Sequence, residues 1–534
     1  MTLDFVAEAF TEQERALLAP HFTNLDGPVF ALLDLPEVVK GALFARYSRS
    51  AKSLRRLFLD EFAEGATTGS AATAVGVARA EQLYERVFFE YGDDSVAQLG
   101  GVHLACEQAS QPLAKVLEWG RLAAYLEQST RYVPYDDKPG GRWRYLVPDE
   151  VKALPELESR YRATLDRSFE TYAAWLGPMQ SFFQEMFPKD PADSDFVYRM
   201  TIRAKACDTL RGLLPAATRS NVGIFATAQA YEQLLLRMRA NPLAEVRDYA
   251  GLMLAELRKV IPAFLTRVDL PDRGVSWTEY LRATTEATAG IGERALHDLA
   301  PEPRAEVTLT DFDPDGEIKV VAAALYAASS LPDDQLLNAA RKMSIDERAA
   351  VLRAYIGERK NRRHKPGRAF ERTSYRFDVL CDYGAFRDLQ RHRLLTLEWQ
   401  PLSTAHGFEI PPEIEPAGLL EDWQAVMTDS AELVDALLGA GLGSAAQYAV
   451  PMAYRIRFYM DMNAREAMHL IELRTTPQGH PVYRRVAQQM HRLIANQAGH
   501  LAIATAMKYA DHSRVELERL EAERRSDAKR QALG

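Results

Sequence analysis

The chain has 534 residues, 47% of them hydrophobic and 26% charged, with a formal net charge of −9 and a pI near 5.8. This composition is typical of a folded protein without long disordered segments, and the length predicts more than one domain. The negative charge argues against nucleic-acid binding as the main function, although it allows a local basic pocket for a small anion.

The chain also lacks the patterns of secreted, zinc-binding and membrane proteins. Its cysteines, Cys106, Cys207 and Cys381, are far apart and odd in number, so neither a disulfide framework nor a zinc site is predicted. Acidic residues stand near the N-terminus where a signal peptide needs lysine or arginine, and no run of about 18 apolar residues occurs. We therefore expect a reduced, cytoplasmic protein with no metal site and no membrane span.

Most of the first half is predicted to be helical. Residues 1–130 are expected to form mainly helices, followed by an irregular stretch rich in proline and glycine at residues 133–147. Helices are expected again over residues 150–270. Prolines and glycines then mark a polar linker over residues 271–315, with a short strand at residues 307–310.

The second half follows a similar order. Helical character resumes at Lys319, and residues 375–380 alternate polar and apolar side chains as a strand does. Residues 417–520 are predicted to be helical again. Residues 516–530 are highly charged and are predicted to form a solvated helix or a frayed tail.

This order predicts that the two halves are diverged copies of one unit. Each copy combines helices, a strand-like segment, an arginine-bearing motif, a proline-containing loop and long helices. We place the first copy at residues 1–270, the linker at residues 271–315 and the second copy at residues 316–534.

Two pairs of positions define the alignment of the copies. Arg121 corresponds to Arg393, an offset of 393 − 121 = 272, and Pro215 corresponds to Pro451, an offset of 451 − 215 = 236. The first copy therefore has about 272 − 236 = 36 extra residues between these positions, which we place within residues 137–200.

The densest polar cluster of the second half is Arg391-His392-Arg393. Two guanidiniums beside an imidazole form a concentrated set of donors suited to phosphates or to an electron-rich ring. The alternative is a solvated basic patch on a helix. Apolar Leu394 and Leu395 favour partial burial, and buried arginines need an anionic partner such as a bound ligand.

The corresponding segment of the first half contains Glu127, Ser129 and Arg131. If this segment is extended, the three side chains share one face and offer a carboxylate, a hydroxyl and a guanidinium. Such a face suits a nucleotide that bears a phosphate. A surface strand with ordinary polar side chains is the alternative.

Together the two segments resemble the motif R-H-R-x-x-S-x-N-E-x-S-x-R-Y of the flavin-dependent thymidylate synthases. The second copy keeps the opening, residues 391–393 with Thr396 in place of serine, and lacks the ending. The first copy keeps the ending, Glu127-x-Ser129-x-Arg131-Tyr132, and has Trp119-Gly120-Arg121 at the opening. Each half has retained what the other has lost.

Further motifs of the same family follow in order. Residues 91–96 resemble its G-H-x-S/T turn, with Asp93 at the histidine position, and residues 366–371 occupy the equivalent place in the second copy. Residues 211–215 are similar to the family's A-R-x-x-L-P, whereas the second copy has Gln447 instead of the arginine.

The last shared motif is a helix. Residues 463–474 resemble the family's N-A-R-x-x-x-N/H-x-x-x-L-R, and Arg239 is the nearest counterpart of the final arginine in the first copy. The resemblance extends over most of residues 80–250 and 360–500.

The resemblance implies an α+β fold made of two diverged copies of the flavin-dependent thymidylate synthase fold. Each copy would have a small antiparallel sheet flanked by long helices, and the two would form a pseudo-dimer. Members of the family are homotetramers with active sites between subunits. Two of these chains are therefore expected to form a homodimer equivalent to a pseudo-tetramer.

The resemblance also assigns residues to two ligands. The flavin, FAD, is expected to contact residues of the second copy: Arg391, His392, Arg393, Asn463, Arg465 and His469. Deoxyuridine monophosphate (dUMP) is expected to contact mainly the first copy, with one arginine of the second reaching it across the interface: Glu127, Ser129, Arg131, Arg211 and Arg474.

The implied reaction is the reductive methylation of dUMP to dTMP. NADPH would reduce the flavin and methylenetetrahydrofolate would give the carbon, with no protein nucleophile and no certain catalytic residue. Two alternatives stay open: a related flavoenzyme that modifies another pyrimidine nucleotide, and a catalytically silent scaffold that binds flavin or nucleotide.

Overall fold

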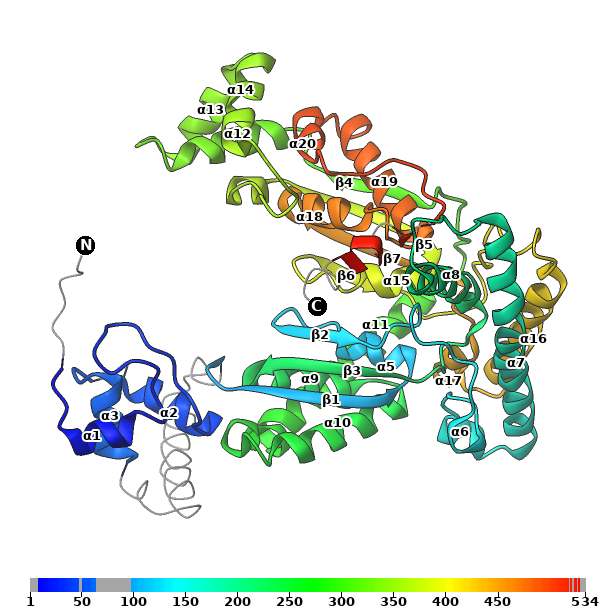
Figure 1. The fold of residues 1–534 in the computed structure, drawn as a ribbon, viewed down its shortest axis with the longest axis horizontal. Coiled ribbons are helices and arrows are strands. Elements are labelled where there is room, and N and C mark those ends of the chain that lie inside the picture. The colour runs from blue at the N-terminus through cyan, green and yellow to red at the C-terminus, as the bar shows by residue number, and fades with distance from the viewer. Residues whose placement is uncertain are drawn as a thin grey trace. The chain divides into compact units, whose positions relative to one another are not determined.

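The computed structural model describes residues 8–47, 50–63, 98–517, 519–520, 523–525 and 527–528 (Figure 1). The chain forms two compact units, each assembled from separate stretches of sequence. The first consists of residues 1–107, 122–127 and 221–299, and the second of residues 108–121, 128–220 and 300–534. The domains predicted from the repeat follow a different division, because most of residues 108–220 belongs to the same compact unit as residues 300–534.

The first unit holds a three-stranded sheet in the order β1-β3-β2. Its strands are β1 (Gly101–Ala109), β2 (Ala123–Glu127) and β3 (Ser220–Thr227), and β2 pairs with β3 in antiparallel fashion. On β3, Val222, Ile224 and Ala226 are buried and the residues between them are exposed. This alternation places one face of the strand in the core.

Helices account for most of the remainder of this unit. They are α1 (Glu12–Leu18), α2 (Glu37–Tyr47), α3 (Leu54–Glu61), α9 (Ala228–Ala240), α10 (Ala244–Leu257) and α11 (Ser276–Ala295), with short helical turns at η4 (Pro262–Asp269) and η5 (Pro271–Val275). The hydroxyl of Tyr231 on α9 lies 3.0 Å from the carbonyl of Val102 and 3.2 Å from that of Ile224, which ties this helix to the sheet.

The second unit holds a four-stranded antiparallel sheet in the order β4-β5-β7-β6. Its strands are β4 (Val307–Phe312), β5 (Ser374–Asp382), β6 (Thr396–Trp399) and β7 (Arg455–Asn463). Phe377 of β5 pairs with Met460 of β7, and both are fully buried. The core of this unit therefore lies against the central strands.

The helices of the second unit precede, interrupt and follow this sheet in the sequence. They are α5 (Gln111–Leu117), α6 (Asp149–Lys152), α7 (Pro155–Met186), α8 (Asp195–Leu210), α12 (Gly316–Tyr326), α13 (Asp333–Lys342), α14 (Ile345–Ile356), α15 (Tyr383–Leu389), α16 (Leu420–Gly439), α17 (Gly443–Ala446), α18 (Ala464–Arg474), α19 (Pro481–Asn496) and α20 (Leu501–Ala506). Single 3₁₀ turns occur at η2 (Pro139–Gly141), η3 (Arg211–Leu213), η6 (Arg368–Arg372) and η7 (Gln447–Ala449).

The predicted α+β class is confirmed, and so are the two strands predicted at β4 and β5. The helical stretches predicted at residues 150–270 and 417–520 are interrupted by β3 and β7. The mainly helical residues 1–130 also contain β1 and β2, of which β2 lies where the sequence allows an extended segment. The segment predicted as a linker contains α11. Strands β3 and β7 each lead directly into a helix, so the helical pattern of the sequence obscured them. None of the helices described is both long and apolar enough to span a membrane.

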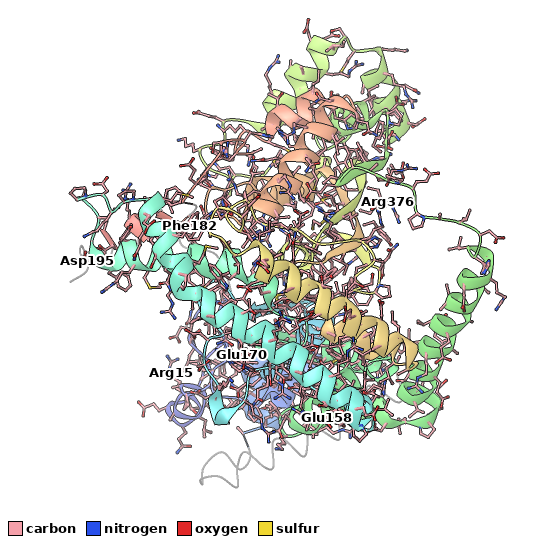
Figure 2. All side chains as sticks on the ribbon, turned by 90° about the vertical axis from the view of Figure 1, so that its right-hand side faces the viewer. Arg15, Glu158, Glu170, Phe182, Asp195 and Arg376 are labelled. Atoms are coloured by element: carbon pink, nitrogen blue, oxygen red, sulfur yellow. The ribbon has the colours of Figure 1, made fainter. Side chains whose placement is uncertain are left out.

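The two longest helices of the second unit, α7 and α16, lie side by side (Figure 2). Trp175 Nε1 of α7 donates to Asp422 Oδ2 of α16 at 2.7 Å, and Arg167 Nη1 donates to Asp429 Oδ2 at 2.5 Å. These contacts join a helix of the first copy to a helix of the second.

The same order of main elements occurs twice: strand, helix, strand, long helix, 3₁₀ turn, strand, helix. Additional elements are inserted into this order, namely η2, α6 and α8 in the first copy and α17 in the second. The helix N-caps follow the two offsets of the sequence alignment. Ser110 caps α5 and Asp382 caps α15, with 382 − 110 = 272. Thr227 caps α9 and Asn463 caps α18, with 463 − 227 = 236. In each case a side-chain oxygen accepts a hydrogen bond from a backbone N–H of the first helical turn.

Equivalent segments of the two copies also pair with each other around Pro215 and Pro451, which form an antiparallel bridge. Ala216 N donates to Val450 O at 2.8 Å, and the equivalent bond runs from Met452 N to Leu214 O at 2.9 Å. A second reciprocal pair joins Ala217 N to Tyr448 O and Ala453 N to Gly212 O, at 2.8 and 3.0 Å. Every bond in this seam, residues 212–217 with residues 448–453, thus has a counterpart at the offset of 236.

Candidate functional site

The segment after β2 places Ser129 and Arg131 in a turn. The strand ends at Glu127, and Ser129 O accepts hydrogen bonds from the backbone N–H groups of Tyr132 (3.2 Å) and Val133 (3.1 Å). The expectation that Glu127, Ser129 and Arg131 alternate along one strand face is therefore wrong beyond Glu127. Glu127 itself is buried and belongs to the first compact unit, whereas Ser129 and Arg131 belong to the second.

Arg131 points from this turn toward α8. Its Nη2 lies 2.6 Å from Asp208 Oδ2, and its Nη1 donates to Gln478 O at 3.2 Å. Burial works to raise the pKa of Asp208, but the guanidiniums of Arg131 and Arg211 outweigh it and hold the pKa below its usual value. The pair is therefore ionised and nearly closed to water.

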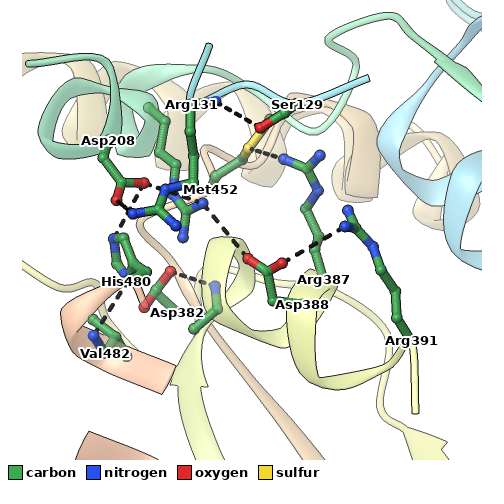
Figure 3. Close-up of polar contacts among 12 residues, drawn as sticks. Ser129, Arg131, Asp208, Asp382, Arg387, Asp388, Arg391, Met452, His480 and Val482 are labelled. Atoms are coloured by element: carbon green, nitrogen blue, oxygen red, sulfur yellow. Dashed lines mark hydrogen bonds and ion pairs between the residues drawn. The ribbon is translucent and has the colours of Figure 1, made fainter. Parts of the chain in front are cut away.

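Arg211 follows α8 directly and reaches the same place. Its Nη1 lies 3.4 Å from Asp208 Oδ1 and 3.9 Å from Asp388 Oδ2. A Cβ added at Gly384 would lie 3.1 Å from Arg211 Nε, so the backbone of α15 approaches the guanidinium closely because this residue is glycine. Figure 3 shows Asp388 at the centre of this arrangement.

Two arginines of the second copy complete the group. Arg391 Nη1 and Arg474 Nη1 each lie 3.7 Å from Asp388 Oδ1, and Arg474 Nη2 donates to the backbone carbonyl of Asp388. Burial works to raise the pKa of Asp388, but Arg391, Arg474, Arg211 and Arg131 together hold it far below its usual value. We call these four arginines with Asp208 and Asp388 the arginine cluster.

His480 borders the arginine cluster at the start of α19. Its Nδ1 accepts from Val482 N at 3.3 Å, and its Nε2 lies 3.9 Å from Asp208 Oδ1. Burial and the charge of Arg211 lower the pKa of His480 to about 3, so the imidazole is neutral at neutral pH.

His392 lies beside the arginine cluster and is buried. Its Nε2 accepts from Arg474 Nε at 3.0 Å, because a guanidinium only donates, and its Nδ1 lies 3.0 Å from Glu466 Oε1. Burial, then Arg474, holds the pKa of His392 well below its usual value. The ring is therefore neutral, with its hydrogen on Nδ1 facing Glu466.

Glu466 belongs to the first turn of α18. Burial raises its pKa to about 7, although Lys365, Arg465 and Arg393 act in the opposite direction. Its backbone N–H is bound at 2.9 Å by the side chain of Asn463, the N-cap of the helix. The side-chain oxygen of Asn463, a predicted flavin contact, is thus already used in the fold.

A basic pocket of about 510 Å³ opens next to α18 and is lined by Arg362, Arg363, Lys365, Arg465 and His469. Arg465 is held in place by Pro366 O at 3.0 Å and Glu371 Oε1 at 3.3 Å. Burial lowers the pKa of His469 to about 4, so the imidazole is neutral in this pocket. The donors of the pocket suit an anionic group such as a diphosphate.

His392, Glu466 and His469 also stand close enough for a metal ion, with ligand atoms within 4.8 Å of one another. Both ring nitrogens of His392 are already bonded to protein groups. The neighbouring cations of the basic pocket would repel a metal ion, so an anion is the better fit here.

The structure therefore gathers Arg131, Arg211, Arg391 and Arg474 in one place, and Arg465 and His469 in another. Arg393 is exposed. Sequence reasoning missed Asp208, Asp388, Glu466 and His480. Two features of the sequence could have indicated Asp388 and Glu466. Asp388 lies three residues before Arg391, and Glu466 directly follows Arg465.

The equivalent positions in the other copy have different partners. Gln447, the counterpart of Arg211, accepts a hydrogen bond from Leu402 N at 3.1 Å. Arg239, the counterpart of Arg474, forms an ion pair with Asp269 at 2.7 Å. The turn with Asp93 at residues 91–96 lies outside the described residues.

All three cysteines are buried. Burial raises the pKa of the Cys106 and Cys207 thiols to about 11, and that of Cys381 even further above its usual value. A thiol in this state is a poor nucleophile.

Two sheet-and-helix repeats joined by a reciprocal seam, with an arginine cluster drawn from both, define a duplicated, thymidylate synthase-like protein. The chain belongs to the thymidylate synthase complementing protein family, whose model matches residues 42–263 and 308–498. Both copies are included in that match.

Two relatives match this chain over nearly its whole length. The chain is 38% identical over 526 residues to a UPF0159 protein of Chlamydia muridarum, covering 97% of this chain and 99% of that one. It is 31% identical over 517 residues to a UPF0159 protein of Thermoplasma acidophilum, covering 92% and 99%. A flavin-dependent thymidylate synthase of Clostridium tetani is 25% identical over 179 residues, covering 33% of this chain and 66% of that one.

Proposed function

We propose that the protein is a flavin-dependent thymidylate synthase-like enzyme that reductively methylates dUMP to dTMP, with methylenetetrahydrofolate as carbon donor and NADPH as reductant. The observation that carries the proposal is the arginine cluster. Arg131 and Arg211 of the first copy meet Arg391 and Arg474 of the second around one buried point. Converging guanidiniums in a semi-buried place favour a phosphate monoester.

The nucleotide would bind with its phosphate at the arginine cluster. Ser129, in the turn that carries Arg131, would contact the same ligand, and Glu127 at the end of β2 stays a proposed contact to the nucleotide. Each arginine–phosphate hydrogen bond would contribute roughly 1.5–3 kcal/mol, because it is charge-assisted. Two or three such bonds support an affinity in the micromolar range.

The basic pocket fits the diphosphate of FAD, because its cations are open to an anionic ligand. Arg465 and His469 would hold the cofactor there, and His392, Arg393 and Asn463 stay proposed contacts to FAD. Arg391, which the sequence assigned to FAD, lies instead in the arginine cluster and would face the nucleotide phosphate. Bound FAD would supply the hydride chemistry. The chain of bonds from Glu466 through His392 to Arg474 would fix the orientation of His392 between the two ligands.

The reciprocal bonds of the seam support a pseudo-dimer of the two copies within one chain. We further propose that two chains form a homodimer equivalent to a pseudo-tetramer. Light scattering on the 59.9 kDa chain should then give about twice that mass. A monomer at micromolar concentration would contradict this assembly.

A catalytically silent scaffold is the second candidate. Asp208 and Asp388 already face the guanidiniums that would hold the phosphate, so the charges can serve stability alone. A related flavoenzyme acting on another pyrimidine nucleotide would use the same phosphate contacts and differ at the base.

The test combines flavin uptake with nucleotide titration. The purified protein should take up FAD, and calorimetry should then detect dUMP binding. Arg131→Ala should weaken dUMP roughly 100-fold, because the phosphate loses a buried guanidinium, while FAD stays bound. Arg167→Ala, which removes an arginine ion-paired on the surface of α7, is the matched control and should leave both affinities unchanged.

Unchanged dUMP affinity in Arg131→Ala would refute the composite site. A protein that binds both ligands without forming dTMP from the full set of substrates would instead favour the silent scaffold.

A further inference from the structure

Asp388 is the only carboxylate among the described residues that contacts three of the four arginines of the cluster. Its oxygens lie 3.7 Å from Arg391 and from Arg474 and 3.9 Å from Arg211. These distances are those of ion pairs without hydrogen bonds. At these distances the carboxylate attracts the guanidiniums without accepting a hydrogen bond from them.

Several buried polar atoms in and beside the arginine cluster have no hydrogen-bond partner within the described part of the chain. Among them are the donors Arg131 Nε and Arg211 Nη2 and the acceptors Asp208 Oδ1 and Asp382 Oδ2, so the acidic and basic groups of the cluster do not fully satisfy one another. Such groups are costly unless a ligand satisfies them. An oxyanion with several acceptor oxygens, such as phosphate, is the ligand that matches guanidinium donors.

The balance of charge identifies what opposes that ligand. Arg391 Nε also lies 3.7 Å from Glu118 Oε2, so the four guanidiniums face the carboxylates of Asp208, Asp388, Asp382 and Glu118. Asp388 alone among these carboxylates lies near three of the guanidiniums, so a bound phosphate would meet its like charge at all three. Removing that charge would strengthen the attraction of the guanidiniums for the phosphate.

We propose that Asp388 is the resident counter-ion of the phosphate subsite, and that a phosphate group binds there in competition with its carboxylate. The proposal rests on the proposed function in one respect, that the phosphate belongs to a nucleoside monophosphate. Asp388 then determines specificity: it keeps free phosphate weakly bound, so that only a ligand with a base and sugar to add further contacts is retained.

Asp208 differs from Asp388 in a way that supplies a control. It lies 2.6 Å from Arg131 Nη2, at hydrogen-bond distance, and so positions that guanidinium. Asp208→Asn and Asp388→Asn remove the same charge from the same cluster. A competitor and a positioning residue should respond in opposite directions.

The experiment is calorimetric titration of the full-length protein with inorganic phosphate and, separately, with dUMP. Asp388→Asn should bind both probes at least about tenfold more tightly than the wild type, because a nearby like charge is removed. Asp208→Asn should bind both more weakly. Unchanged or weaker binding in Asp388→Asn overturns the proposal, and so does equal tightening in both variants, which would reflect overall charge alone.

Asp388→Glu keeps the charge and extends the side chain toward the arginines, so it should bind both probes no more tightly than the wild type. Tighter binding by this variant also overturns the proposal, and this arm applies if Asp388→Asn fails to fold. The two probes separate this inference from the proposed function. Suppose that Asp388→Asn binds phosphate more tightly but that no variant prefers dUMP over phosphate. That result would support the counter-ion role of Asp388 and would refute a nucleoside monophosphate as the ligand.

Discussion

The arginine cluster and the basic pocket are both rich in cations, but they are built in opposite ways. In the cluster, Asp208 and Asp388 lie among the guanidiniums and the group is largely buried. In the pocket, Arg363 and Lys365 are exposed and form no ion pair with any described residue. Charge in the cluster therefore supports the fold as well as a ligand, whereas charge in the pocket is available to a ligand and to salt.

The largest expected effect follows from removing a cluster arginine. Arg211→Ala leaves Asp208, Asp382 and Asp388 undercompensated in a buried place, so we expect a loss of about 3–5 kcal/mol in the free energy of unfolding. Arg363→Ala, the same change in the open pocket, should cost less than about 0.5 kcal/mol. Urea unfolding measures both values. Equal losses would remove the distinction between the two regions.

A smaller effect concerns Glu466, which lies between the two regions. Burial raises its pKa in the folded state to about 7, above its usual value of 4.5. Because the folded state holds the proton more tightly, the stability from this group is fully present below pH 4.5 and is lost as the pH rises through 7. The loss amounts to roughly 3 kcal/mol.

Glu466→Gln removes that titration and keeps an oxygen for His392 Nδ1. The variant should therefore be more stable than the wild type at pH 8, and the difference should shrink toward pH 4.5. Urea unfolding at both pH values checks the sign. A difference that is constant with pH would mean that the environment of Glu466 does not favour its protonated form.

The smallest expected effect is the response to salt. Raising the ionic strength from about 0.1 M to about 1 M shortens the Debye length from about 10 Å to about 3 Å. The two exposed cations, Arg363 and Lys365, worth about 0.5 kcal/mol each, predict a roughly fivefold loss of FAD affinity at the basic pocket. Binding of dUMP at the buried cluster should fall by less than about threefold. Titrations of both ligands at the two salt concentrations test this prediction. Equal losses of FAD and dUMP affinity would contradict the difference between the pocket and the cluster.

The sequence was sufficient to predict the arginines of the cluster, but it was not sufficient to predict the carboxylates that pair with them. The family motifs identified Arg131, Arg211, Arg391 and Arg474 as ligand contacts, although they assigned Arg391 to the flavin and the other three to the nucleotide. The offsets of 272 and 236 recur in the helix N-caps. Asp388 was visible beside Arg391, but its role depends on how α15 approaches Arg211 at Gly384, which is a tertiary contact. Residue spacing alone does not report such contacts.

The strands show the same limit. The alternation of Ile456, Phe458 and Met460 in β7 was present in the sequence, yet the helical periods on both sides outweighed it. The turn at residues 129–132 was also missed, because an alternating polar pattern fits a strand as well as a turn closed by Ser129. Hydrogen bonding to the neighbouring strand decides where β2 ends.

In a symmetric interface between two identical chains, equivalent positions always hold the same residue. In the seam of this chain, equivalent positions can hold different residues because both copies are part of one sequence. Gly212 occupies one side, where an added Cβ would lie 2.6 Å from Cη2 of the fully buried Trp423. Its counterpart at the offset of 236 is Tyr448, which is also buried. Because the two copies belong to one chain, a glycine and a tyrosine can occupy equivalent positions of one symmetric backbone arrangement, and each half can change without the other.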